Sequence, residues 1–202
     1  MATHPAALPH VNLIIPGIDG SCSSHWQSQW EQSRGDCRRV DLGSWNEPQP
    51  IRWMALLDDA VRQYRGSSIV LVGHSLGSIL VAWWAHHKAR SCAAISGAML
   101  VAPCDPDSMR DERLRPFAPV PSRRLPFPVT VVASRNDPYA SFEWTAGLAR
   151  ILGATLIDVG QAGHINRDSQ LGAWPQGECL LEAVIARTSH DAQSARRSIG
   201  AR

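Results

Sequence analysis

The sequence predicts an α/β protein with a mostly or wholly parallel sheet of about six strands and helices on both faces. Short apolar runs alternate along the chain with longer segments whose apolar residues recur at helical spacing. The short runs are mostly apolar and show no period-two alternation, as in strands buried on both faces, although the run at 37–42 is weaker. No repeat or linker divides the 202 residues. We therefore expect one domain over residues 1–187 and a polar, basic tail over 188–202 that frays.

The elements follow in order from these patterns. Six apolar runs predict strands, at residues 11–16, 37–42, 67–72, 97–102, 128–134 and 154–160. Helical spacing predicts helices at residues 51–64, 76–87, 141–152 and 177–187. Trp26 and Trp30 are four residues apart, which places both on one face of a further helix. The Pro-rich segment 103–128 carries nearly balanced charges and is expected to form a solvated loop or short lid.

Composition excludes several classes of function. The net charge of +2 argues against nucleic acid as a partner, because phosphate-binding proteins normally carry a strong basic excess. No apolar run approaches the roughly 20 residues that span a bilayer, and the first residues do not resemble a signal peptide. Five scattered cysteines suit a reducing compartment, so we expect a cytoplasmic protein without a membrane partner. We also expect neither a metal nor a cofactor, since Cys22 and His25 form a lone C-x-x-H pair.

The most informative stretch is Gly73-His74-Ser75-Leu76-Gly77, which matches G-x-S-x-G. In a nucleophile elbow the serine occupies a strained turn between a strand and a helix, and flanking glycines avoid crowding. The motif here lies between a predicted strand and a predicted helix, which is the context it requires. A simple structural turn is the alternative, but the context favours Ser75 as a nucleophile.

A serine nucleophile needs a base and an acid that orients the base, and on this fold the chain order is serine, acid, histidine. His164 lies in the glycine-containing loop GQAGHINRD (residues 160–168), which follows the last predicted strand and is called the histidine loop below. It is the candidate base. Asp137 directly follows the fifth predicted strand and is the candidate acid. Asp158 is the rival, but it lies within a predicted strand, where its side chain would face the helices. His74 is expected to be a packing residue.

An oxyanion hole needs two backbone donors. One is the N–H of Leu76, the residue after the nucleophile. The other should come from the loop after the first strand, where Ile18 is the first candidate and Asp19 the second.

Four sequence blocks together resemble the small YdeN-like serine hydrolases of the α/β-hydrolase superfamily. The blocks are IIPGIDGSCSSHW, GHSLGS, SRNDPY and GHINRDSQLGAWPQGE. The resemblance covers roughly residues 8–187 and implies a three-layer α/β-hydrolase fold without a large cap domain, with Ser75, Asp137 and His164 as the triad. Some animal relatives are discussed as binders of proteins of the pocket-protein class, through the motif L-x-C-x-E. No cysteine of this chain lies in that pattern, so the role does not carry over.

The expected activity is hydrolysis of a small-molecule acyl substrate, with esters first and thioesters or activated amides as further options. Trp45 and Trp174 follow the second strand and the histidine loop, and they are candidates for lining an acyl pocket, although large aromatic residues more often pack in cores. A binding or scaffold protein that retains a residual hydrolase site is the alternative function.

Overall fold

The six predicted strands form one wholly parallel sheet. The computed structural model describes residues 9–88, 90–108 and 110–199. Its strands are β1 (His10–Ile15), β2 (Cys37–Arg39), β3 (Ser68–His74), β4 (Ile95–Val101), β5 (Val129–Ala133) and β6 (Thr155–Asp158). They are arranged in the order β2-β1-β3-β4-β5-β6, and every neighbouring pair is parallel.

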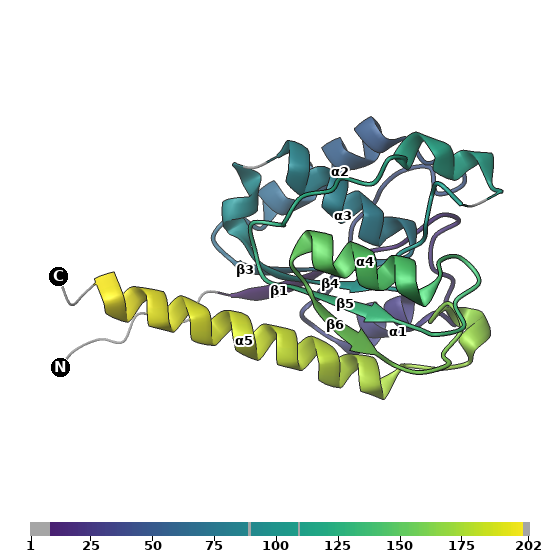
Figure 1. Ribbon diagram of the computed structural model, residues 1–202. Coiled ribbons are helices and arrows are strands. Elements are labelled where there is room, and N and C mark those ends of the chain that lie inside the picture. Colours follow the sequence, from purple (N-terminus) through teal and green to yellow (C-terminus); the bar gives the residue numbers. More distant parts are fainter. Residues whose placement is uncertain (1–8, 89, 109, 200–202) are drawn as a thin grey trace.

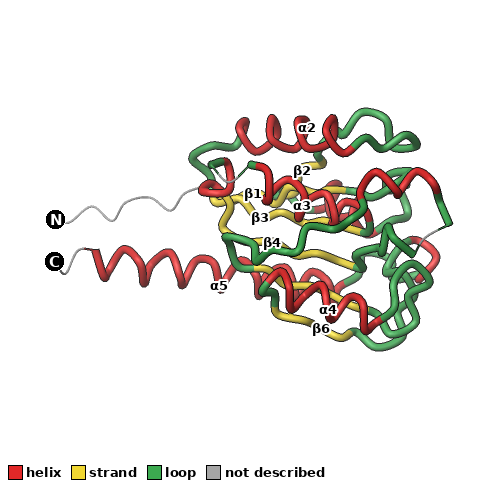
Figure 2. The backbone as a smooth tube through the Cα atoms, turned by 45° about the horizontal axis from the view of Figure 1, so that its top comes forward, coloured by secondary structure: helices red, strands yellow, loops and turns green. Residues whose placement is uncertain are grey.

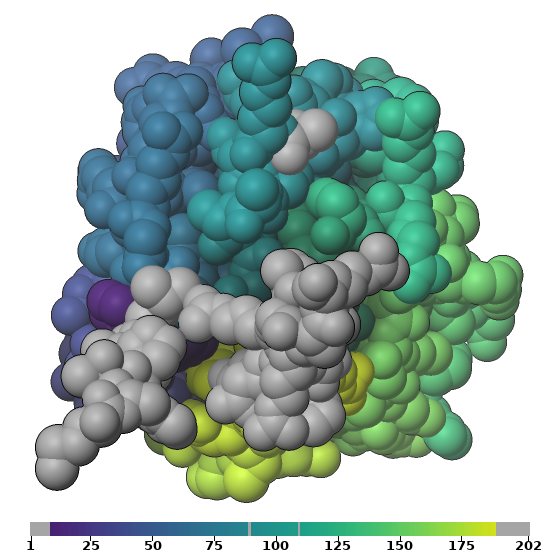
Figure 3. Space-filling view, turned by 90° about the vertical axis from the view of Figure 1, so that its left-hand side faces the viewer, coloured from purple at the N-terminus to yellow at the C-terminus, as the bar shows by residue number. Residues whose placement is uncertain are grey.

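Helices cover both faces of the sheet, which confirms the three-layer architecture. The α-helices are α1 (Trp26–Ser33), α2 (Pro50–Gln63), α3 (Leu76–His87), α4 (Phe142–Leu152) and α5 (Pro175–Ile199), and the 3-10 turns are η1 (Ser91–Ala94), η2 (Glu112–Phe117) and η3 (Arg167–Ser169). Helices α2, α3 and α4 lie on one face, and α1 and α5 lie on the other (Figure 1). Seen from the left of that view, the blue and teal surface of α2 and α3 lies above the yellow surface of α5 (Figure 3).

The continuous apolar character of the strands follows from burial on both faces. Along β1, Leu13 and Ile15 pack toward α2, α3 and α4, whereas Ile14 packs toward α1 and α5. Neighbouring side chains on a strand point to opposite faces, so a sheet with two covered faces favours apolar residues at successive positions. In β3 the same division separates Leu71 from Val70 and Val72.

The last helix is longer than predicted, whereas the connection between β4 and β5 agrees with the prediction. The helix predicted over 177–187 is longer, because α5 continues through the segment that we expected to fray and ends at Ile199. Residues 200–202 of that segment lie outside the described part of the chain. Between β4 and β5, the described residues form only η2 as regular structure, so this connection is a strap and not a large cap domain. Loops gather at the end of the sheet opposite the free end of α5 (Figure 2).

The face beneath the sheet buries two neutral histidines. His25 is the N-cap of α1, where its Nδ1 accepts the backbone N–H of Gln27 at 3.2 Å. Its ring packs edge-on against His74, with the ring centroids 4.8 Å apart. Burial, with a smaller contribution from nearby His164, lowers the pKa of His25 to about 4. Burial also holds the pKa of His74 well below its usual value. Both rings are therefore neutral at pH 7.

A glycine allows α3 to begin directly against the end of β1. A Cβ atom built on Gly77 would lie 2.2 Å from the carbonyl oxygen of Ile15 and 2.6 Å from that of Pro16. These are backbone atoms at a strand end, and they cannot rotate away as a flexible side chain would. Gly147 in α4 contrasts with Gly77, because a Cβ there would have no atom within 4 Å.

We predict opposite effects for two glycine-to-alanine substitutions. Gly77→Ala forces backbone segments apart and should lower the free energy of unfolding by at least about 3 kcal/mol. Gly147→Ala adds a methyl group in open space within a helix and should raise the free energy by about 0.5–1 kcal/mol. Urea unfolding of both variants measures the two changes. Equal effects from the two substitutions would contradict the steric argument.

We also predict that the protein loses stability as the pH falls from about 6.5 to about 4. The unfolded chain binds a proton on His25 in that range while the folded protein does not, so the free energy of unfolding decreases with falling pH. The shift of this pKa to about 4 corresponds to up to about 3 kcal/mol. His25→Asn keeps an N-cap acceptor without a titrating ring, so it should reduce the pH slope of the unfolding midpoint. An unchanged slope would exclude His25 as a source of the effect.

Candidate active site

Ser75 occupies a sharp turn between β3 and α3. Its backbone has φ 54° and ψ −124°, a conformation that non-glycine residues rarely adopt. The N–H of Ser75 donates to the carbonyl of Val101 on β4 at 3.0 Å, which holds the turn against the sheet. A Cβ on Gly73 would lie 2.9 Å from the backbone of Ser78, so the tight turn requires a glycine at this position. The serine side chain is consequently held at the carboxyl end of the sheet.

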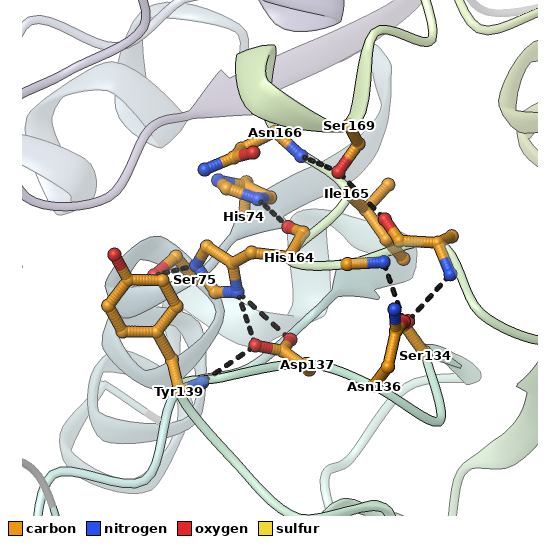
Figure 4. Close-up of polar contacts among 12 residues, drawn as sticks. His74, Ser75, Ser134, Asn136, Asp137, Tyr139, His164, Ile165, Asn166 and Ser169 are labelled. Carbon is orange, nitrogen blue, oxygen red and sulfur yellow. Dashed lines mark hydrogen bonds and ion pairs between the residues drawn. The ribbon is translucent and has the colours of Figure 1, made fainter.

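The three residues predicted as a triad are joined by hydrogen bonds through His164, which contacts both Ser75 and Asp137 (Figure 4). His164 Nε2 is 2.9 Å from Ser75 Oγ, and His164 Nδ1 is 2.9 Å from each carboxylate oxygen of Asp137. The residues come from the turns after β3, β5 and β6, whose carboxyl ends meet at one edge of the sheet. When Nδ1–H donates a hydrogen bond to the Asp137 carboxylate, Nε2 is unprotonated and can accept a hydrogen bond from the hydroxyl of Ser75.

The rival acid lies elsewhere. Asp158 is the last residue of β6, and its carboxylate accepts Arg135 Nε at 2.7 Å and the N–H of Gly160 at 2.8 Å. The expectation that its side chain would face the helices was wrong, because Arg135 provides an ion-pair partner at the protein surface. The exposed guanidinium lowers the pKa of Asp158.

His74 has a contact that sequence reasoning missed. Its Nε2 donates to the backbone carbonyl of His164 at 2.9 Å (Figure 4). Trp26 Nε1 donates to the next carbonyl, that of Ile165, at 2.7 Å. These two donors come from β3 and α1 and hold the backbone of the histidine loop. A polar residue next to the serine, at the end of an apolar strand, was the only signal in the sequence.

The loop after β1 lies against the serine turn. A Cβ on Gly17 would be 2.9 Å from Ser75 Cβ and 3.1 Å from the backbone nitrogen of Leu76. The N–H of Asp19 donates to the carbonyl of Trp45 at 2.9 Å, so it is not available to a substrate. Within the described part of the chain, the N–H groups of Ile18 and Leu76 have no protein acceptor. This geometry favours Ile18 over Asp19 as the second oxyanion donor.

A cavity of about 360 Å³ opens beside Ser75. Its walls include Ile18, Cys104, Leu114 and Tyr139. The ring of Tyr139 lies 4.3 Å from that of His164, measured between centroids. Burial raises the pKa of the Cys104 thiol to about 12, so this group stays neutral in the cavity wall.

Neither tryptophan that we proposed for an acyl pocket lines this cavity. Trp174 is only 3% exposed and stacks on Trp30 beneath the sheet, with ring centroids 6.0 Å apart. Trp45 packs edge-on against Trp53. Both expectations were wrong, because Trp174 is buried beneath the sheet and the half-buried Trp45 packs against Trp53 on α2. The contribution of Trp45 to the site comes from its backbone carbonyl, which holds Asp19.

Charged side chains at the rim of the cavity are paired. Arg113 on η2 donates to Asp19 at 2.9 and 3.2 Å, to Asp111 at 2.7 Å, and to the carbonyl of Asn46 at 3.2 Å. These contacts raise the pKa of Arg113, and the guanidinium lowers the pKa of Asp111. Arg167 pairs with the adjacent Asp168 at 3.1 Å. The rim therefore presents ion pairs to a substrate.

Two further observations concern the described residues as a whole. No group of three or more His, Cys, Asp or Glu side chains in this part of the chain is arranged to hold a metal ion. Among the same residues, no helix combines the length and apolarity needed to cross a bilayer.

Comparisons with known proteins agree with this architecture. A family model described as serine hydrolase matches residues 12–183. A protein described as a YdeN-like hydrolase from Pectobacterium atrosepticum is 28% identical, with a TM-score of 0.78 over 89% of this chain and 92% of that chain. The ydeN gene product from B. subtilis is 19% identical, with a TM-score of 0.66 over 88% and 99% of the two chains.

An esterase from Thermogutta terrifontis shares the fold at 18% identity, with a TM-score of 0.65 over 92% of this chain and 86% of that chain. No match was found among curated proteins. The family model spans most of the chain and agrees with the YdeN-like fold and the serine turn; this protein belongs to the serine hydrolase family, in its small YdeN-like form.

Proposed function

We propose that the protein is an esterase-like serine hydrolase that cleaves small esters through a Ser75–His164–Asp137 triad and an acyl-enzyme. The observation that carries the proposal is the continuous hydrogen-bonded path from Ser75 Oγ through the imidazole to Asp137, at 2.9 Å for each contact. Thioesters and activated amides undergo the same acyl transfer and are further candidate substrates.

In this mechanism, His164 takes the hydroxyl proton as Ser75 Oγ attacks the acyl carbonyl carbon. Asp137 holds the imidazole in the required tautomer and stabilises the imidazolium that forms. The backbone N–H groups of Leu76 and Ile18 donate to the oxyanion of the tetrahedral intermediate. His164 then protonates the leaving alcohol, which departs and leaves an acyl-enzyme. Water activated by the same histidine releases the acid and restores the serine.

The substrate proposal rests on the size and walls of the cavity. About 360 Å³ accommodates a compact acyl group, and the strap between β4 and β5 adds little apolar surface that could cover a long chain. The paired charges at the rim offer poor contacts to a lipid tail. Short acyl chains therefore suit the site better than long ones.

We predict that Ser75→Ala abolishes covalent labelling by a fluorophosphonate probe and lowers ester turnover by several orders of magnitude. The matched control is Ser78→Ala, one turn further along α3, where the hydroxyl only donates to the carbonyl of Val101 at 3.2 Å. The control should label like the wild type. Wild-type protein that neither labels nor hydrolyses esters would instead support a binding protein with a residual site.

We predict a preference for short chains in a series of p-nitrophenyl esters from acetate to palmitate. Binding energy gained from added methylene groups should stop increasing once the cavity is filled. The value of kcat/KM should therefore peak at short acyl lengths, without a jump above the substrate's micellar concentration. An optimum at palmitate would contradict the proposed fit and indicate that the strap covers long chains.

A further inference from the structure

Side chains extend the pairing of β5 and β6 beyond the ends of both strands. Backbone hydrogen bonds continue first: the N–H of Val159 donates to the carbonyl of Ala133 at 3.0 Å, and the N–H of Arg135 donates to that of Gly160 at 2.7 Å. Beyond this point the backbones no longer pair. The two segments that follow, 134–137 and 162–164, carry the candidate acid and base.

Three consecutive contacts then join these segments. Ser134 Oγ accepts the N–H of Ala162 at 3.0 Å, and Asn136 Oδ1 accepts the N–H of Gly163 at 2.8 Å. The third is the contact between Asp137 and His164. Ser134 Oγ also donates to Asn136 Oδ1 at 2.9 Å, which links the first two contacts (Figure 4).

Asn136 and its partner Gly163 are the direct neighbours of the two triad residues Asp137 and His164. Asn136 directly precedes Asp137, and Gly163 directly precedes His164. The hydrogen bond between the preceding residues therefore ties together the two backbones one residue away from the carboxylate–imidazole contact. Gly163 has φ 57°, so the backbone adopts a left-handed conformation directly before His164. A change in that turn would rotate the imidazole away from Asp137.

Other contacts hold the histidine loop but do not replace this one. His74 binds the carbonyl of His164 from β3, and Ser169 Oγ donates to the carbonyl of Ala162 at 2.7 Å. Neither contact connects the histidine loop to the segment that carries Asp137. In the described part of the chain, Ser134 and Asn136 provide that link just before the triad contact.

We propose that Asn136, supported by Ser134, is a positioning residue that sets the alignment of the His164 imidazole with Asp137. This inference rests on the proposed function of the triad. Ser134 is 2% exposed, whereas Asn136 is exposed. Water can therefore replace the hydrogen bond of Asn136 to Gly163 with little loss of stability. Water does not tie Gly163 to the residue next to Asp137, so alignment is lost while the fold is kept.

The test compares Asn136→Ala with Asn136→Asp, which keeps an acceptor at the same place. With p-nitrophenyl acetate, Asn136→Ala should lower kcat by about tenfold with little change in KM, because small misalignments slow the chemical step. Asn136→Asp should stay within about threefold of the wild type. Ser134→Ala, which removes the supporting hydroxyl, should give a smaller loss in kcat than Asn136→Ala.

The matched control is Asp158→Asn. This substitution removes the negative charge that pairs with Arg135, so it also weakens a link between the end of β6 and the segment after β5. It contacts no residue of the triad. Its kcat should match that of the wild type, and urea unfolding should show all four variants folded. A kcat within about twofold of the wild type in Asn136→Ala would overturn the proposal. Equal losses in Asn136→Ala and Asn136→Asp would also overturn it.

A second measurement does not depend on the choice of substrate. Proton NMR should show a low-field resonance from His164 Nδ1–H hydrogen-bonded to Asp137, assigned by its absence in His164→Gln. Asn136→Ala should broaden or shift this resonance, and Asn136→Asp should preserve it. If wild-type protein hydrolyses no ester but shows this pattern, the proposed function fails and the positioning role stands. An unchanged resonance in Asn136→Ala refutes the positioning role alone.

Discussion

The close approach of three backbone segments around Ser75 is the constraint on which the rest of the structure depends. The end of β3, the start of α3 and the loop after β1 pass so near one another that Gly17, Gly73 and Gly77 leave no room for side chains. This crowding keeps Ser75 in its uncommon backbone conformation. It also places the loop that carries Ile18 directly beside the serine turn.

The sheet brings the other two triad residues to the serine turn. Parallel strands end at a common edge, so turns that are distant in sequence meet beside Ser75. The strand pairing alone does not align a carboxylate with an imidazole, because β5 and β6 separate before either residue is reached. Side-chain contacts bridge that gap on one side, and His74 holds the histidine backbone on the other. The strands thus bring the turns close together, and the short side-chain hydrogen bonds align the carboxylate with the imidazole.

Local patterns predicted the strands, the serine turn and the order of the candidate triad, because each depends on a short stretch and its neighbours. Long-range packing was not predictable in the same way. Trp174 follows the histidine loop as a pocket residue would, yet its ring is buried against Trp30, far away in the sequence. The hydrogen bond of His74 to the histidine loop spans 90 positions. The extension of α5 beyond residue 187 was missed because its polar composition resembles that of a tail.

The direction of α5 has a practical consequence. This helix begins at Pro175, shortly after the histidine loop, and runs back toward the end of the sheet where the strands begin (Figure 1). Its far end therefore points away from the cavity beside Ser75. A molecule anchored to a solid support through the end of α5 would present its cavity outward to the surrounding solution. The end of α5 is thus a suitable attachment point for oriented immobilisation that leaves the cavity beside Ser75 accessible.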